Sequence, residues 1–138
     1  MLEITVKNGL LVFGQDAIRY DGEGTTFAEL KQMIGTWGAR LRAAPMLGAS
    51  VYLPFGISDD WIEAFEVEGD GDVVSLRAVE LEAVGYTPAM DSLMDEIEDP
   101  RPRAVMVRRD QAFLTCRKSD LIDAIEALQQ RLLSSSAG

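Results

Sequence analysis

The sequence predicts a single α+β domain in which a mostly antiparallel sheet, built from hairpins, carries about three helices. Short strand-like segments follow one another across tight turns, which is typical of antiparallel hairpins. Three other segments have apolar residues at helical spacing. The 138 residues are 47% hydrophobic and 26% charged, as in globular proteins. We therefore expect one domain over residues 1–133, followed by a flexible tail over residues 134–138.

The first hairpin is expected at the start of the chain. Residues 2–7 alternate apolar and polar side chains, and residues 10–13 form an apolar run. Between them, Asn8 and Gly9 are residues that tolerate the positive φ angles of a two-residue hairpin turn. A short third strand is expected over residues 17–20.

The first helix is indicated by its start signal and its apolar spacing. Thr26 and Glu29 have the spacing of a capping box. Apolar side chains then recur at steps of three and four as far as Ala44, and Pro45 ends the pattern. This predicts one helix of about 18 residues, with Trp37 on the stripe that packs against the sheet.

The middle of the chain predicts a second hairpin. Strands over residues 61–68 and 73–82 flank a turn over residues 69–72 that is rich in Gly and Asp. A strand over residues 51–55 precedes them, and Pro54 indicates that it is an edge strand or ends there.

The beginning of this hairpin has a second interpretation. Ser58, Asp59 and Asp60 are all residues that cap helices well. A short helix running into Phe65 is therefore an alternative to a strand that begins at Trp61.

The last third of the chain predicts a helix, a hairpin and a final helix. Thr87 caps a helix over residues 88–97, with proline at its first position. Strands over residues 104–107 and 112–116 are expected to pair as a third hairpin. Ser119 caps the final helix.

Charge is unevenly distributed along the chain. Residues 59–99 hold fourteen acidic residues and one base, Arg77, whereas residues 100–118 hold six bases and one acid, Asp110. The net charge of the whole chain is -10. An acidic block of this kind repels nucleic acid and anionic membranes and attracts basic proteins. Because strand-like apolar residues run through the block, we expect it to be folded with its acids outside.

Several kinds of chemistry are excluded by composition. The chain has no histidine and one cysteine, which excludes a Ser-His-Asp triad and any zinc site built on histidine or cysteine. Cys116 precedes Arg117 and Lys118, which could lower the pKa of its thiol, although a half-buried strand residue is the simpler interpretation. The acidic turn around Asp70 lacks the ligand spacing of an EF-hand. We therefore expect no metal and no cofactor, and favour a binding protein over an enzyme.

The function that fits this composition is a cytoplasmic protein-binding module. We expect an inhibitor of the immunity-protein kind, which neutralises a basic protein such as a bacterial toxin or effector. No signal peptide or membrane-spanning run is expected. Acids would steer the partner and Trp61 would anchor it, unless Trp61 belongs to the core. The expected contact residues, on one contiguous negative surface, are Asp59, Asp60, Trp61, Glu66, Glu68, Asp70, Asp72, Glu80 and Glu82.

Two alternatives stay open at this point. One is a small enzyme or ligand-binding domain that uses carboxylates and arginines, which should show a deep pocket. The other is a structural or assembly protein that works as a homo-oligomer. Nucleic acid is not expected as a partner, because no aromatic residues interleave with Arg101, Arg103, Arg108 and Arg109.

Overall fold

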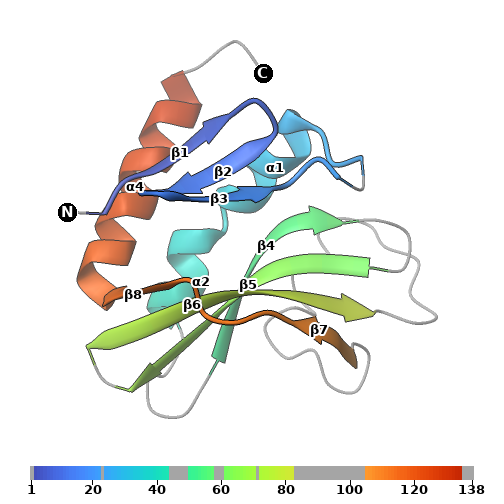
Figure 1. Ribbon diagram of the computed structural model, residues 1–138. Coiled ribbons are helices and arrows are strands. Elements are labelled where there is room, and N and C mark those ends of the chain that lie inside the picture. Colours follow the sequence, from blue (N-terminus) through green and yellow to red (C-terminus); the bar gives the residue numbers. More distant parts are fainter. Residues whose placement is uncertain are drawn as a thin grey trace.

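The structure is a computed structural model that describes residues 2–22, 24–43, 50–57, 61–70, 72–82 and 105–134. It confirms the α+β class, with two antiparallel sheets and helices packed on them (Figure 1). The three-stranded sheet lies above the five-stranded sheet in this view, and the C-terminal helix runs along one side of both.

The three-stranded sheet is the meander that the N-terminal sequence predicts. It consists of β1 (Ile4–Lys7), β2 (Leu10–Phe13) and β3 (Asp16–Arg19), in that order. Asn8 and Gly9 have φ angles of 53° and 80°, which is the turn that a two-residue hairpin requires. The first hairpin and the third strand are thereby confirmed.

The predicted single helix is wrong, because the structure divides it into α1 (Phe27–Ile34) and α2 (Trp37–Ala43). The capping box between Thr26 and Glu29 is confirmed. The break falls at Thr36, whose backbone N–H and hydroxyl both donate to the carbonyl of Met33, at 3.0 and 2.8 Å. This tight turn from Met33 to Thr36, which contains Gly35, replaces the regular helical bond.

The five-stranded sheet begins with β4 (Ser50–Ile57), β5 (Trp61–Asp70) and β6 (Val73–Glu82), each antiparallel to the next. The predicted second hairpin is confirmed. The strand β4 lies at the edge of the sheet, as Pro54 indicated, and its register shifts between Pro54 and Gly56.

The predicted third hairpin is wrong. The strands β7 (Val105–Arg109) and β8 (Leu114–Arg117) do not pair with each other, and both pair with β6. Leu76 and Val79 of β6 are three residues apart in the sequence. Their pairing partners, Leu114 of β8 and Arg109 of β7, are five residues apart. The segment is therefore one broken strand with two extra residues, which follows a ten-residue strand along its open side instead of turning back on itself.

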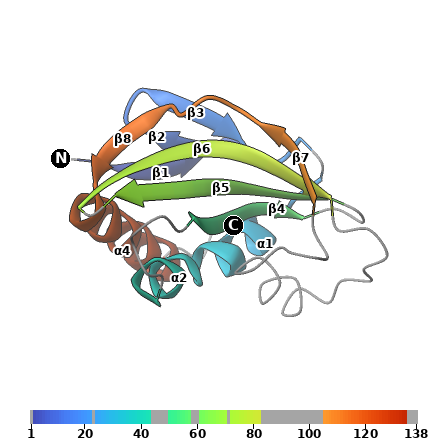
Figure 2. The same ribbon diagram turned by 90° about the horizontal axis from the view of Figure 1, so that it is seen from below.

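The core lies where helices and both sheets meet. The helix α4 (Lys118–Ser134) contacts β1 and β8, and α1 and α2 pack against β4 (Figure 2). Trp37 is fully buried, as predicted, and its ring meets Phe65 edge to face at a centroid distance of 5.8 Å. Phe65 also contacts Phe13 of the other sheet at 5.0 Å, so aromatic rings connect the two sheets to the helices.

Several expectations concern residues that the structure does not describe. The helix over residues 88–97 and residues 135–138 of the expected tail lie outside the described residues, whereas Ser134 is the last residue of α4. The alternative of a short helix running into Phe65 is wrong, because Trp61–Asp70 is the strand β5. Within the described part of the chain, no helix is long and apolar enough to cross a membrane.

Candidate functional site

The acidic residues expected to form one surface are separated by the register of β5 and β6. Side chains two residues apart on a strand share a face, so Glu66 and Glu68 lie on one face, with their partners Arg77 and Ser75. Glu80 pairs with Glu63 and lies on the opposite face. A single contiguous surface that includes Glu80 is therefore wrong.

The remaining expected residues are spread along the hairpin. Trp61 and Asp70 are the first and last residues of β5, and nine steps along the strand separate them by roughly 30 Å. Glu82 pairs with Trp61 at one end, and Asp72 lies in the turn at the other end. Asp59 and Asp60 lie outside the described residues, and only the backbone is described for Trp61, Asp70 and Glu82.

Glu66 is buried, with 4% of its surface exposed, and so was wrongly expected on the outer rim. Its carboxylate accepts a hydrogen bond of 3.1 Å from the hydroxyl of Tyr52, across β4 and β5. The Nε of Arg77 lies 3.6 Å from the same carboxylate, and its Nη2 lies 3.4 Å from Glu68. One guanidinium thus lies within ion-pair distance of two carboxylates.

The turn end of this face is open to solvent. The side chain of Glu68 is 43% exposed, and Asp72 is exposed and makes no ion pair within the described part of the chain. Val73, beside the turn, is half exposed at 50% and shares the outer face with Ser75 and Arg77. We call Glu68, Asp72 and Val73 the hairpin tip; it combines negative charge with an apolar side chain.

The second pair of acids faces the other side of the sheet. Glu63 and Glu80 are directly opposite each other, and Glu80 pairs in turn with Arg108 on β7. A side chain at Gly56 would lie 3.2 Å from the carboxylate of Glu63 and 3.3 Å from the hydroxyl of Thr25. The absence of a side chain at Gly56 therefore lets Glu63 approach the start of α1.

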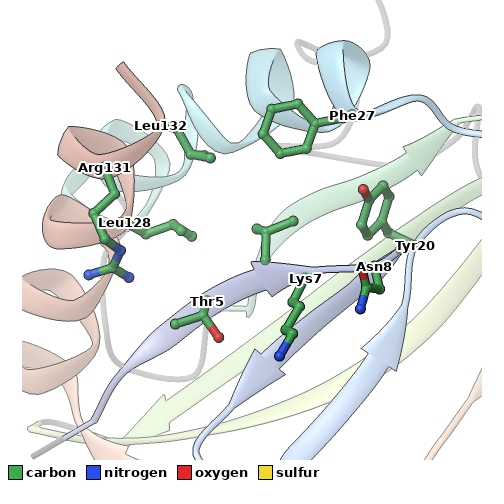
Figure 3. Close-up of a pocket in the computed structure, with 10 residues that line it drawn as sticks. Thr5, Lys7, Asn8, Tyr20, Phe27, Leu128, Arg131 and Leu132 are labelled. Atoms are coloured by element: carbon green, nitrogen blue, oxygen red, sulfur yellow. The ribbon is translucent and has the colours of Figure 1, made fainter. Parts of the chain in front are cut away.

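A groove that the sequence did not predict lies along β1 (Figure 3). Its volume is about 540 Å³, in the range of small-ligand sites. Phe27, Leu128 and Leu132 form its apolar side, and Lys7 and Arg131 are charged residues that line it. Its walls come from β1, α1 and α4, which are far apart in the sequence, so no local sequence motif marks it.

Cys116 does not have the activated thiol that its basic neighbours suggested. It lies on β8 and is partly buried. Burial raises the pKa of the Cys116 thiol above its ordinary value, and the negative charge of Asp120 raises it further. The expectation of a lowered pKa is wrong, and the simpler interpretation as a half-buried strand residue is the correct one.

Chemical groups for metal binding do not gather in the part of the chain that the structure describes. No three residues among its Cys, Asp and Glu side chains are placed to hold a metal ion.

Comparison with protein-family models, with curated proteins and with solved structures finds no match to this chain. The proposals below therefore depend on the chain's own residues.

Proposed function

We propose that this protein is a cytoplasmic protein-binding module that neutralises a basic protein partner, as immunity proteins neutralise toxins or effectors. The contact surface is the hairpin tip, at the exposed turn end of the outer face of β5 and β6. One observation carries the proposal: Arg77 is the only base in residues 59–99, and it is already engaged by Glu66 and Glu68. Asp72, which is exposed and makes no ion pair with a described residue, keeps its charge for a partner.

Charge at the hairpin tip suits fast association. Exposed acids such as Asp72 attract a cationic surface over about a Debye length, roughly 10 Å at 0.1 M salt. They act mainly on the association rate, since rim charges stay solvated in the complex. The half-exposed Val73 supplies apolar area at the centre of the same patch.

An interface of ordinary size would extend beyond the hairpin tip, but the outer-face residues toward Trp61 are at most 1% exposed; they are Ile62, Ala64, Val79 and Leu81. A standard interface buries about 800 Å² on each partner, which corresponds to a patch about 30 Å across. The strand β5 spans a similar length from Trp61 to Asp70. The register places Trp61 and Glu82 on the face of Glu63 and Glu80, opposite the hairpin tip, so the proposed contact region stays at the turn end of the hairpin.

Charge reversal tests the proposal. A basic partner would be isolated from the native host by affinity to the wild-type protein, and its affinity then measured for the triple variant Glu68→Lys, Asp70→Lys, Asp72→Lys. The matched control is Glu3→Lys, Asp16→Lys, Asp123→Lys, which changes three acids outside β5 and β6 and gives the same net charge. We expect the affinity for the partner to fall at least tenfold in the first variant and to stay unchanged in the control. Equal losses of affinity in both variants would mean that net charge, rather than this surface, binds the partner.

A further inference from the structure

One edge of the three-stranded sheet is open, and the hydrogen-bond pattern shows which groups face outward. The N–H of Gly14 donates to the carbonyl of Glu3 at 3.2 Å, which makes these two residues a hydrogen-bonded pair. Pairs alternate along an antiparallel ladder, so Thr5 and Lys7 also bond to β2. The N–H and C=O groups of Ile4 and Val6 therefore point outward from the edge of the sheet, away from β2.

Only part of this edge is covered. The guanidinium of Arg131 on α4 donates to the carbonyl of Ile4. The backbone N–H and C=O of Val6 have no hydrogen-bond partner in the described part of the chain. An exposed edge strand can pair with a strand of another chain, and proteins usually protect such edges against this pairing. Here the open groups of Val6 lie in the groove along β1.

The two sides of the edge differ in chemistry. Val6 packs against the core, on the side where Phe27, Leu128 and Leu132 line the groove. Lys7 is on the opposite face of β1, and its side chain extends away from the helices in Figure 3. A strand laid along this edge would therefore meet apolar side chains on one face and a lysine on the other.

The charge of the groove is opposite to that of the whole protein. Neither Lys7 nor Arg131 makes an ion pair with a described residue, and no carboxylate is among the described residues that line the groove. This is unusual in a chain of net charge -10. Two cations without a counterion favour an acidic ligand.

We propose that the edge of β1 binds an extended acidic peptide as an added strand. The peptide alternates acidic and apolar residues: its apolar side chains pack on Phe27, Leu128 and Leu132, and its acids meet Lys7. The N–H and C=O of Val6 bond to its backbone, which is how strand addition gains affinity. This site is on the other sheet from the hairpin tip, and it selects ligands of opposite charge.

The probe is a fluorescein-labelled peptide of about six residues that alternates Glu and Val, with a peptide that alternates Lys and Val as control. Fluorescence anisotropy measures binding, and amide hydrogen exchange is followed at Val6. We expect binding of the acidic peptide only, with slower exchange at the Val6 amide. Equal binding of the basic peptide, or unchanged exchange at Val6 in the complex, would overturn the proposal.

Two variants separate the backbone bonds from the charge. Val6→Pro removes an outward N–H that is not part of the ladder, so the fold should tolerate it, and Ala17→Pro is its control on the opposite edge, β3. We expect Val6→Pro to weaken binding roughly two- to tenfold, and Ala17→Pro to leave it unchanged.

Lys7→Glu leaves the backbone intact and decides the outcome if Val6→Pro does not fold. It should weaken binding of the acidic peptide about three- to tenfold. Wild-type affinity in a folded Val6→Pro variant or in Lys7→Glu would contradict strand addition at this edge.

Discussion

The indole N–H of Trp37 donates to the carbonyl oxygen of Pro54 over 2.8 Å, in the interior of the protein. This bond fastens α2 to the edge strand β4 at the place where its register shifts. Because Trp37 also meets Phe65 edge to face, one side chain connects a helix, an edge strand and the middle of the sheet.

Replacing Trp37 therefore gives the first prediction. Trp37→Ala should lower the free energy of unfolding by about 3–5 kcal/mol, because it leaves a cavity and an unpaired carbonyl. Trp37→Phe keeps an aromatic ring and should cost less. Urea denaturation followed by circular dichroism measures both. An unchanged midpoint for Trp37→Ala would contradict the position of this residue in the core.

The second prediction concerns the ion pair under the outer face of the sheet. Arg77→Ala should cost about 2–3 kcal/mol, less than a fully buried pair because the side chain of Arg77 is 22% exposed. The loss arises mainly from the carboxylate of Glu66, which stays buried. Adding Glu66→Gln to Arg77→Ala should therefore recover part of the stability in urea denaturation.

Glu68 supplies the control for that experiment. Its side chain is 43% exposed, so Glu68→Gln should change the stability by no more than about 0.5 kcal/mol. A larger loss for Glu68→Gln than for Arg77→Ala would reverse the assignment of the buried and exposed partners.

The third prediction concerns the pH dependence at Cys116. The thiolate is the reactive form, so a raised pKa means slow alkylation by iodoacetamide at neutral pH. The folded pKa lies above the unfolded one, so the associated stability is complete at lower pH and declines as pH rises through the folded value. Asp120→Asn should shift the alkylation profile to lower pH. A wild-type profile below that of an unfolded peptide would contradict the assigned environment.

The fourth prediction tests the start of α1. The hydroxyl of Thr26 accepts from the N–H of Glu29 at 3.1 Å, and Glu29 accepts in return from the N–H of Thr26 at 2.9 Å. Thr26→Ala should cost about 1 kcal/mol, and Thr26→Ser should be nearly neutral. Thermal denaturation measures the stability of both variants. Equal losses of stability in Thr26→Ala and Thr26→Ser would show that the hydroxyl does not cap the helix.

Features set by neighbouring residues could be predicted from the sequence. Asn8 and Gly9 determine a turn by their own backbone preferences, and Thr26 and Glu29 cap each other within one helical turn. The two wrong predictions about the fold concern interactions over different distances along the sequence. The helix break at Thr36 depends on how one side chain competes for a backbone carbonyl. The broken strand β7–β8 depends on β6, a partner distant in sequence.

The candidate sites follow the same pattern. The period of two along β5 could have separated Glu66 from Glu63, since adjacent odd and even positions face opposite sides. The burial of Glu66 could not be foreseen, because it depends on Tyr52 and Arg77 from two other strands. The groove depends on α4 packing beside β1, so no pattern along the chain brings Lys7 and Arg131 together.

The central claim is that the acids near the β5–β6 turn receive a basic protein partner. Its most direct test is the association rate of the purified partner, measured by stopped flow from about 20 to about 200 mM salt. For the wild type, and for the control Glu3→Lys, Asp16→Lys, Asp123→Lys, we predict a rate that falls steeply with salt. For Glu68→Lys, Asp70→Lys, Asp72→Lys we predict a slower rate with little salt dependence. A triple variant that keeps the wild-type rate and salt dependence would contradict the account.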